Sequence, residues 1–175
     1  MGVKDWLFGK KKGKNQVNIC LPDESFVLAE VRSKDGVELH LMIINKSLGD
    51  YKEDVQLKRV FGYYCSIIFE YEDVDENQWP SSEEFAVMQN FTDEFDKALK
   101  NDAVHPNALF VARVTSNDGT CQMIWVLNNP DLAINYLDDL IAKGNQTREF
   151  EYRIEKDPTW DSIDYFLEGY KNNNK

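Results

Sequence analysis

The segment from residue 73 to residue 84 carries oxygen-bearing side chains that could hold a hard cation. They stand at positions one, three, five and twelve of the segment, the spacing with which an EF-hand loop surrounds Ca²⁺. These residues are Asp73, Asp75, Asn77 and Glu84. However, Gln78 stands where that loop needs glycine, and Pro80 interrupts the segment. Because Ser81 and Glu84 also have the spacing of a helix capping box, we assign both a structural role at a helix start and predict no metal site.

The other reactive residue types form no catalytic pattern. His40 and His105 have no Cys, His or carboxylate partner at metal-ligand spacing. Cys20, Cys65 and Cys121 lie 45 and 56 residues apart, which predicts free thiols rather than a disulfide framework. The chain lacks the G-x-S-x-G elbow of a hydrolase and a glycine-rich phosphate loop. We predict no catalytic residue and no cofactor, although a triad assembled across distance escapes a search by spacing.

Charge narrows the class of partner. The net charge is -11, although residues 1–14 hold five lysines against one aspartate, so the rest of the chain is more acidic than the total. Such a body repels phosphate backbones and favours a basic protein partner over nucleic acid. The acidic loop before the first long helix contributes Asp73, Asp75, Glu76 and Trp79 as candidate partner contacts.

Three segments are predicted to supply strands to one sheet. Alternating apolar residues over 26–45, with Asp35 and Gly36 between them, predict a hairpin, and a charged loop over 46–58 follows it. Residues 60–71 are apolar on both faces, which is typical of a central strand. Residues 108–127 form a second hairpin that turns at 117–119.

Two long helices are predicted between these strands. The first runs over 82–100, where apolar residues recur at helical spacing. The second opens at Asn129 and Pro130, ends at Gly144, and has a stripe formed by Ala133, Leu137, Leu140 and Ile141.

The tract from 148 to 167 changes its hydrophobic period from two to about 3.6. Phe150, Tyr152 and Ile154 alternate with charged residues, as in an edge strand. Asp157 then offers a helix N-cap and Pro158 a first helical residue. We expect Trp160 to anchor this last helix in the core.

These elements predict an α+β fold. From residue 60 onward their order is β-α-β-β-α-β, as in ferredoxin-like folds, with an added N-terminal β-hairpin that extends the antiparallel sheet and a C-terminal helix. The middle strands are apolar on both faces, so the hairpin, the C-terminal helix or a partner must cover the second face.

The organisation predicted is one domain with unstructured ends. We expect a flexible basic arm over 1–20, a single α+β domain over 21–170 and a disordered tail over 171–175. No stretch approaches the ~20 apolar residues of a membrane span, and the N-terminus has no apolar signal core, which favours a cytoplasmic protein. We expect a monomer or a weak dimer.

The chain resembles a bacterial family, domain of unknown function 695. The resemblance rests on the tracts DENQWPSSEEF, FVARVTSNDGTCQMIWVL and YRIEKDPTWDSIDYFL in this order. The family usually has Gly-Leu-Pro where this chain has Gln78, Trp79 and Pro80. The resemblance implies no catalytic residues. It implies that relatives are sometimes joined to a domain like the regulator of ribonuclease E activity B, an acidic protein that binds its enzyme.

Two functional hypotheses remain. The first is a non-enzymatic regulatory or protein-interaction module that offers an acidic surface to a basic partner, with an immunity-type inhibitor as a variant. The alternative is an uncharacterised enzyme or small-ligand-binding domain with a pocket near the loop from Asp73 to Glu84.

Overall fold

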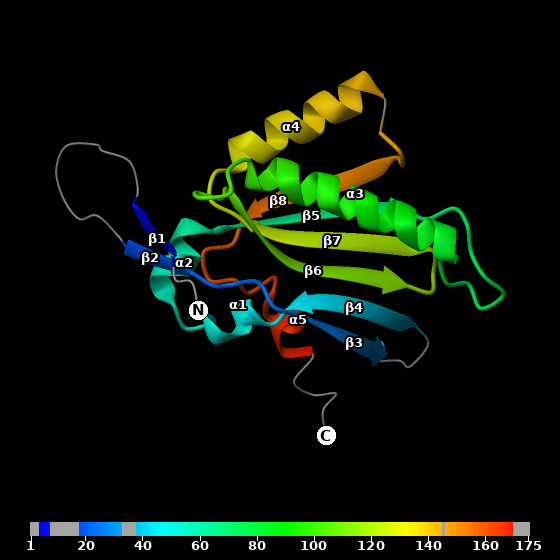
Figure 1. Cartoon of the computed structure of the whole chain (residues 1–175), viewed down its shortest axis with the longest axis horizontal. Helices are drawn as coiled ribbons and strands as arrows, with labels where there is room; N and C mark the ends of the chain where they lie inside the picture. The colour runs from blue at the N-terminus through cyan, green and yellow to red at the C-terminus, as the bar shows by residue number, and fades with distance from the viewer. Residues whose placement is uncertain (1–3, 8–17, 33–37, 145, 170–175) are drawn as a thin grey trace.

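A six-stranded antiparallel sheet runs through the molecule (Figure 1). The computed structural model describes residues 4–7, 18–32, 38–144 and 146–169. The spatial order of the strands is β3-β4-β6-β7-β5-β8. Their bounds are β3 Phe26–Arg32, β4 Leu39–Asn45, β5 Tyr63–Glu70, β6 Ala108–Ser116, β7 Thr120–Leu127 and β8 Phe150–Lys156. The predicted α+β class with an antiparallel sheet is confirmed.

The N-terminal hairpin extends this sheet, as predicted. β3 and β4 pair antiparallel, and β4 continues onto β6 through pairs such as Met42 with Val114. The predicted turn at Asp35 and Gly36 lies outside the described residues. β8 lies at the opposite edge of the sheet, as the alternation of charged and apolar residues in its sequence predicts.

Part of the predicted flexible arm is ordered. β1 (Lys4–Leu7) pairs with β2 (Asn18–Leu21) in a separate two-stranded sheet. Ile19 is buried in the same apolar cluster as Leu57, and this burial gives β2 a fixed place that charge and composition did not indicate. The rest of the arm and residues 170–175 lie outside the described residues.

Two long helices pack on one face of the sheet. α3 (Ser82–Lys100) and α4 (Pro130–Lys143) have the predicted bounds. Ser81 and Asn129 are their N-caps, and Gly144 ends α4 in the left-handed conformation with φ 62°. Ile141, predicted on the buried stripe, is 42% exposed, whereas Ala133 and Leu137 of the same stripe are buried.

Short helices of the chain itself cover much of the other face. α1 (Ser47–Asp50) and α2 (Val55–Val60) replace the loop predicted over 46–58, and α5 (Asp164–Gly169) lies beside them (Figure 1). Asp54 caps α2 by accepting from the backbone N–H groups of Gln56 and Leu57. Leu48 and Leu57 are fully buried, so tertiary packing rather than helical period stabilises these turns.

The last helix begins later than predicted. Residues 157–163 form consecutive turns and α5 starts at Asp164, so Pro158 is not a first helical residue. The cause lies at Trp160, whose φ of 64° is incompatible with a right-handed helix through this position. Asp157 accepts hydrogen bonds from the backbone of Asp161 and Ser162, so it caps these turns instead of α5.

The chain crosses the sheet twice through its long helices. α3 connects β5 to β6, and α4 connects β7 to β8. In each case the two strands run in the same direction and one other strand lies between them. Among the described helices, none combines the length and apolar character needed to cross a membrane.

Candidate functional site

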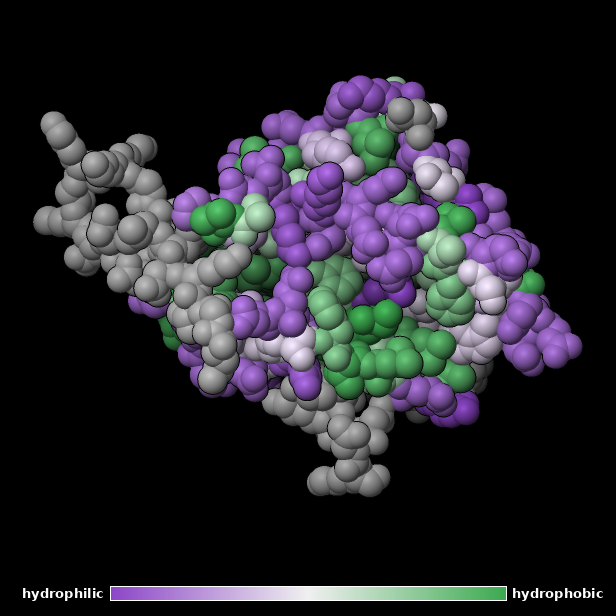
Figure 2. All heavy atoms as spheres, in the orientation of Figure 1, coloured by the Kyte–Doolittle hydropathy of each residue, from purple (hydrophilic) through white to green (hydrophobic). Residues whose placement is uncertain are grey.

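The sheet face of β3 and β4 on the side of α3 is not covered by a helix. Register pairs Leu28 with Ile43, and Leu41 lies on the same face two residues from Ile43. Phe26 is 48% exposed and Leu28 is 69% exposed. Figure 2 shows the resulting hydrophobic area over β3 and β4, next to the hydrophilic surface of α3. Glu30 and Arg32 of β3 are exposed on the same side, and we call its apolar part, formed by Phe26, Leu28, Leu41 and Ile43, the β3–β4 face.

A groove of about 350 Å³ lies between this face and α3. Its apolar wall is formed by Phe26, Ile43 and Phe110, and the rings of Phe26 and Phe110 meet edge to face at 6.0 Å. Its polar lining comes from Glu24, Gln89, Thr92, Asp93, Asp96 and Arg113. We call this space the β4–α3 groove.

Arg113 is the buried charge of this groove. It pairs with Ile43 across β4 and β6 and is 6% exposed. Its Nη1 donates to Gln89 Oε1 at 3.0 Å and to Thr92 Oγ1 at 3.3 Å, both neutral acceptors. Among the described residues no carboxylate lies within ion-pair distance of this guanidinium. Burial lowers the pKa of Arg113, because removal from water penalises the charged form.

The carboxylates around the groove differ in their partners. Lys100 Nζ lies 2.7 Å from Glu24 and 2.6 Å from Asp96, and Asp96 also accepts from the indole of Trp125 at 3.0 Å. Burial lowers the pKa of Lys100, but the hydrogen bonds to both carboxylates outweigh that effect and raise it overall. Asp93 accepts from the amide of Gln89 at 2.8 Å and has no cation within ion-pair distance among the described side chains, although its charge favours the protonated form of Arg113 at longer range.

In the acidic loop that the sequence singled out, Asp73 and Asp75 accept hydrogen bonds from other residues of the loop. Asp73, Asp75 and Glu76 are exposed and Trp79 is half-buried. Asp75 Oδ1 accepts from the backbone of Asn77 at 2.7 Å and of Trp79 at 3.0 Å, and Asp73 accepts from the hydroxyl of Ser81. No group of three or more metal-ligating side chains is found in the described part of the chain. These contacts shape the loop into a compact turn.

Glu84 has a different partner from the one predicted. Its backbone N–H donates to Ser81 Oγ, but the N–H of Ser81 donates to the carbonyl of Asp73, so only half of the capping box forms. The Glu84 carboxylate is 2% exposed and accepts from Arg148 Nη2 at 2.9 Å. Arg148 follows 64 residues later, at the entrance to β8, and ties that strand to the start of α3.

A wider groove of about 910 Å³ lies at the ends of β5 and β8. Its lining includes Glu70, Glu72, Glu149, Glu151 and Arg148. The groove adjoins the start of the Asp73 to Glu84 loop, where the sequence suggested a pocket. Its lining combines these four carboxylates with apolar and aromatic side chains, and Arg148 already has Glu72 at 3.6 Å and Glu84 at 2.9 Å as partners.

His40 contacts a serine and a glutamate, Ser116 and Glu38, and the spacing of these residues in the sequence did not indicate the contacts. Its Nδ1 lies 2.5 Å from Ser116 Oγ and its Nε2 lies 3.6 Å from Glu38. Ser116 is buried, and neither His40 nor Ser116 lines the two grooves described above. Because a nucleophile must reach its substrate, this arrangement fits a contact between β4 and β6 better than a hydrolase triad.

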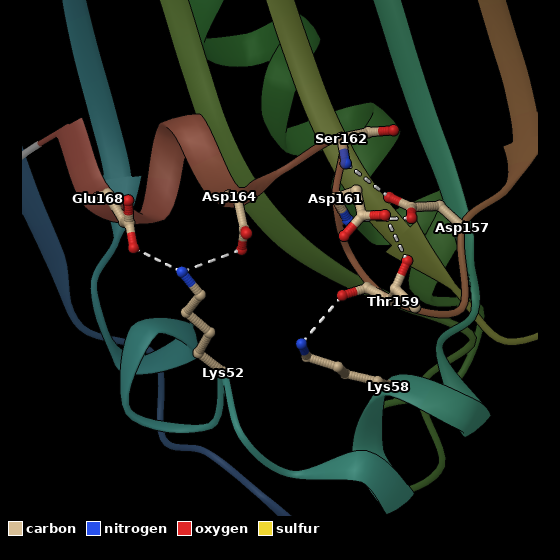
Figure 3. A network of polar contacts seen from close by, with 8 residues as sticks. All are labelled: Lys52, Lys58, Asp157, Thr159, Asp161, Ser162, Asp164 and Glu168. Carbon is tan, nitrogen blue, oxygen red and sulfur yellow. Dashed lines mark hydrogen bonds and ion pairs between the residues drawn. The ribbon is translucent and has the colours of Figure 1, made fainter.

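Trp160 lies in the apolar layer on the side of α1 and α2. Trp160 is fully buried and its indole donates to the carbonyl of Phe61 at 2.8 Å. Lys58 donates to the carbonyl of Thr159 at 2.9 Å, and Lys52 bridges Asp164 and Glu168 (Figure 3). Together these contacts attach the C-terminal turns to α1 and α2.

The chain matches one known family. Residues 41–167, more than half of the chain, match a family described as a family of unknown function, DUF695. The chain belongs to DUF695. No curated protein and no solved structure matches it.

The residues that match DUF695 include only part of the β3–β4 face. The match includes Leu41 and Ile43 of β4 together with Arg113, whereas Phe26 and Leu28 of β3 precede it. The match also ends at Leu167, in α5, so it covers the helices on both faces of the sheet.

Sequence reasoning missed Arg113 in this DUF695 chain. A signal was present, because Arg113 is the one charged residue of the strand ALFVARVTS, which is otherwise apolar or small and polar. A charge inside a central strand needs a partner or a ligand. The groove itself has no sequence signal, since it forms where β4 and α3 meet in space.

Proposed function

We propose that this protein is a non-enzymatic protein-interaction module that binds a basic protein partner through the β3–β4 face. The observation that carries the proposal is the exposed apolar surface of a sheet whose other strands are covered by α3 and α4. Monomeric proteins seldom expose contiguous apolar surface of this kind without an interaction to make.

Charge supports a basic partner. The chain has a net charge of -11, and Asp93 on α3, beside the β3–β4 face, has no cation within ion-pair distance among the described residues. An apolar centre with a polar rim is the usual composition of an interface. The loop of Asp73, Asp75, Glu76 and Trp79 is a weaker candidate, because hydrogen bonds within the loop already occupy oxygens of Asp73 and Asp75.

The proposed scaffold is a ferredoxin-like core. Strands in the spatial order β6-β7-β5-β8, joined through α3 and α4, support this assignment. The β3–β4 hairpin is then an addition to one edge of that core, and the proposed partner surface belongs to this addition. A regulatory role in the cytoplasm is consistent with such a binding surface.

The test uses Leu28→Glu with Leu132→Glu as its matched control. Leu28 is 69% exposed on the face, whereas Leu132 is 45% exposed on α4, away from it. A partner captured by the unmodified protein is purified and its affinity is measured for all three proteins at low and high salt. We expect Leu28→Glu to weaken binding at least tenfold, Leu132→Glu to leave it unchanged, and high salt to weaken it for all three. Equal affinity of the two variants would refute the proposal.

A further inference from the structure

We propose that the β4–α3 groove binds a small zwitterion with an apolar body, of the class of apolar α-amino acids, whose carboxylate is held by Arg113 and whose ammonium group is held by Asp93. The β3–β4 face and this groove share residues, but ligand binding does not depend on the proposed protein partner.

The cationic end of the site is Arg113. Arg113 is 6% exposed, so its guanidinium has lost most of its hydration, and its side-chain hydrogen bonds go to the neutral oxygens of Gln89 and Thr92. Buried charges are normally paired, and an apolar side chain at this position would avoid the cost of desolvation. Arginine matches the geometry of a carboxylate with two parallel N–H donors. A carboxylate in the groove would therefore complete the site.

The anionic end is fixed relative to Arg113 by one amide. Gln89 accepts from Arg113 Nη1 at 3.0 Å and donates to Asp93 Oδ1 at 2.8 Å, so a single side chain orients both charges. Asp93 has no cation within ion-pair distance among the described residues and interacts with Arg113 only at longer range, in contrast to Glu24 and Asp96, which share Lys100. An ammonium group is the complement that Asp93 lacks. The same carboxylates disfavour a ligand with two negative charges.

The remaining surface selects an apolar body. The groove holds about 350 Å³, at the lower end of the range for small-molecule sites, and its wall contains Phe26, Ile43 and Phe110. Two aromatic rings and a branched aliphatic side chain favour a leucine-like or phenylalanine-like side chain over glycine.

The experiment titrates the purified protein with four probes by calorimetry. L-phenylalanine carries all three features, 3-phenylpropanoate lacks the ammonium, phenethylamine lacks the carboxylate, and glycine lacks the apolar body. We expect L-phenylalanine to bind at least tenfold more tightly than each of the others. N-acetyl-L-phenylalanine distinguishes a free amino acid from the end of a peptide chain, and we expect it to bind as weakly as 3-phenylpropanoate. Binding of N-acetyl-L-phenylalanine equal to that of L-phenylalanine, or no binding of any probe, would overturn the proposal.

Variants of Arg113 and Asp93 test which residue binds the carboxylate and which binds the ammonium group of the ligand. Arg113→Met should abolish binding of L-phenylalanine. Because Arg113 is buried and its replacement can affect folding, the variant Asp93→Asn, at an exposed position, gives a second readout. It should weaken the binding of L-phenylalanine at least tenfold and leave the binding of 3-phenylpropanoate unchanged. Asp139→Asn, exposed on α4, is the control and should bind as the unmodified protein does. If Asp93→Asn retains full preference for L-phenylalanine, the assignment is wrong. Leu28 does not line the groove, so Leu28→Glu should keep ligand binding even where it removes the protein partner.

Discussion

Single buried polar residues fix both local turns and contacts between distant parts of this chain. Glu84 binds Arg148, Trp160 donates to the carbonyl of Phe61, and Asp157 accepts two backbone N–H groups. Sequence reasoning recognised the acceptor role of Asp157 because its donors follow within five residues. It could not recognise the Glu84 partner, which lies 64 residues away.

The two buried thiols should make the protein sensitive to alkaline pH. Burial raises the pKa of both Cys65 and Cys121 from 9.0 to about 12. The folded state therefore holds these protons more tightly, so their contribution is fully present below pH 9.0 and is lost as pH rises towards 12. The free energy of unfolding should fall by up to about 1.4 kcal/mol per pH unit for each thiol. Urea denaturation at a series of pH values measures this slope.

The contribution of the thiols is obtained by difference. The double variant Cys65→Ala and Cys121→Ala should have a shallower slope above pH 9.0 than the unmodified protein. Equal slopes for the two proteins would show that the thiols do not cause the loss.

Asp157 should be a strong single contributor to stability. It is 6% exposed, and its two oxygens each accept a backbone N–H at 3.0 Å. Asp157→Ala leaves these donors without their acceptor and should lower the free energy of unfolding by about 2 kcal/mol. Asp157→Asn keeps one acceptor oxygen and should cost less. Asp139→Ala, which removes an exposed pair with Lys143, should cost under about 0.5 kcal/mol. Thermal and urea unfolding measure the free energy of unfolding of each variant. Equal losses of this free energy for Asp157→Ala and Asp139→Ala would contradict the prediction.

At the scale of elements, caps and period sufficed for the long helices and failed for the short ones. α3 and α4 start at Ser82 and Pro130 as their capping residues predict. α1 and α2 have four and six residues, too few to show a hydrophobic period. They form because Leu48 and Leu57 are buried against the sheet, a fact that local sequence does not contain.

The start of α3 should be energetically coupled to the entrance of β8 through Glu84 and Arg148. Removing one partner leaves a buried charge uncompensated, so Arg148→Ala should cost about 3–5 kcal/mol. The double variant Glu84→Ala with Arg148→Ala should cost less than the sum of the two single changes. A double-mutant cycle by urea denaturation measures this coupling. The exposed pair of Arg153 and Glu155 serves as the control cycle and should show coupling under about 1 kcal/mol. Strict additivity at Glu84 and Arg148 would rule out the coupling.

At the scale of the whole molecule, one sheet separates two apolar layers. One layer lies under α3 and α4 and contains Phe95 and Trp125. The other lies under α1, α2 and α5 and contains Trp160 and Ile19. The second layer therefore joins the N-terminal strand β2 to the C-terminal turns.

This arrangement predicts that β2 unfolds together with the domain. Ile19 is 2% exposed, so Ile19→Ala should lower the free energy of unfolding by about 2–4 kcal/mol. Tryptophan fluorescence and far-UV circular dichroism should report the same shifted midpoint, because the domain unfolds as one unit. Val55→Ala, at a 64% exposed position on α2, is the control and should change stability little. An unchanged midpoint for Ile19→Ala would mean that β1 and β2 are independent of the core.

The sequence by itself determined the α+β class, both long helices and the hairpin that extends the sheet, because these depend on periodicity, caps and turn residues that lie close together in the chain. Only the tertiary structure decided which face of β3 and β4 stays exposed, what covers the second face, and that Arg113 has no carboxylate within ion-pair distance among the described residues. These features arise where segments far apart in sequence meet. The free energy that fixes them comes from burial and long-range pairing, which local patterns do not record.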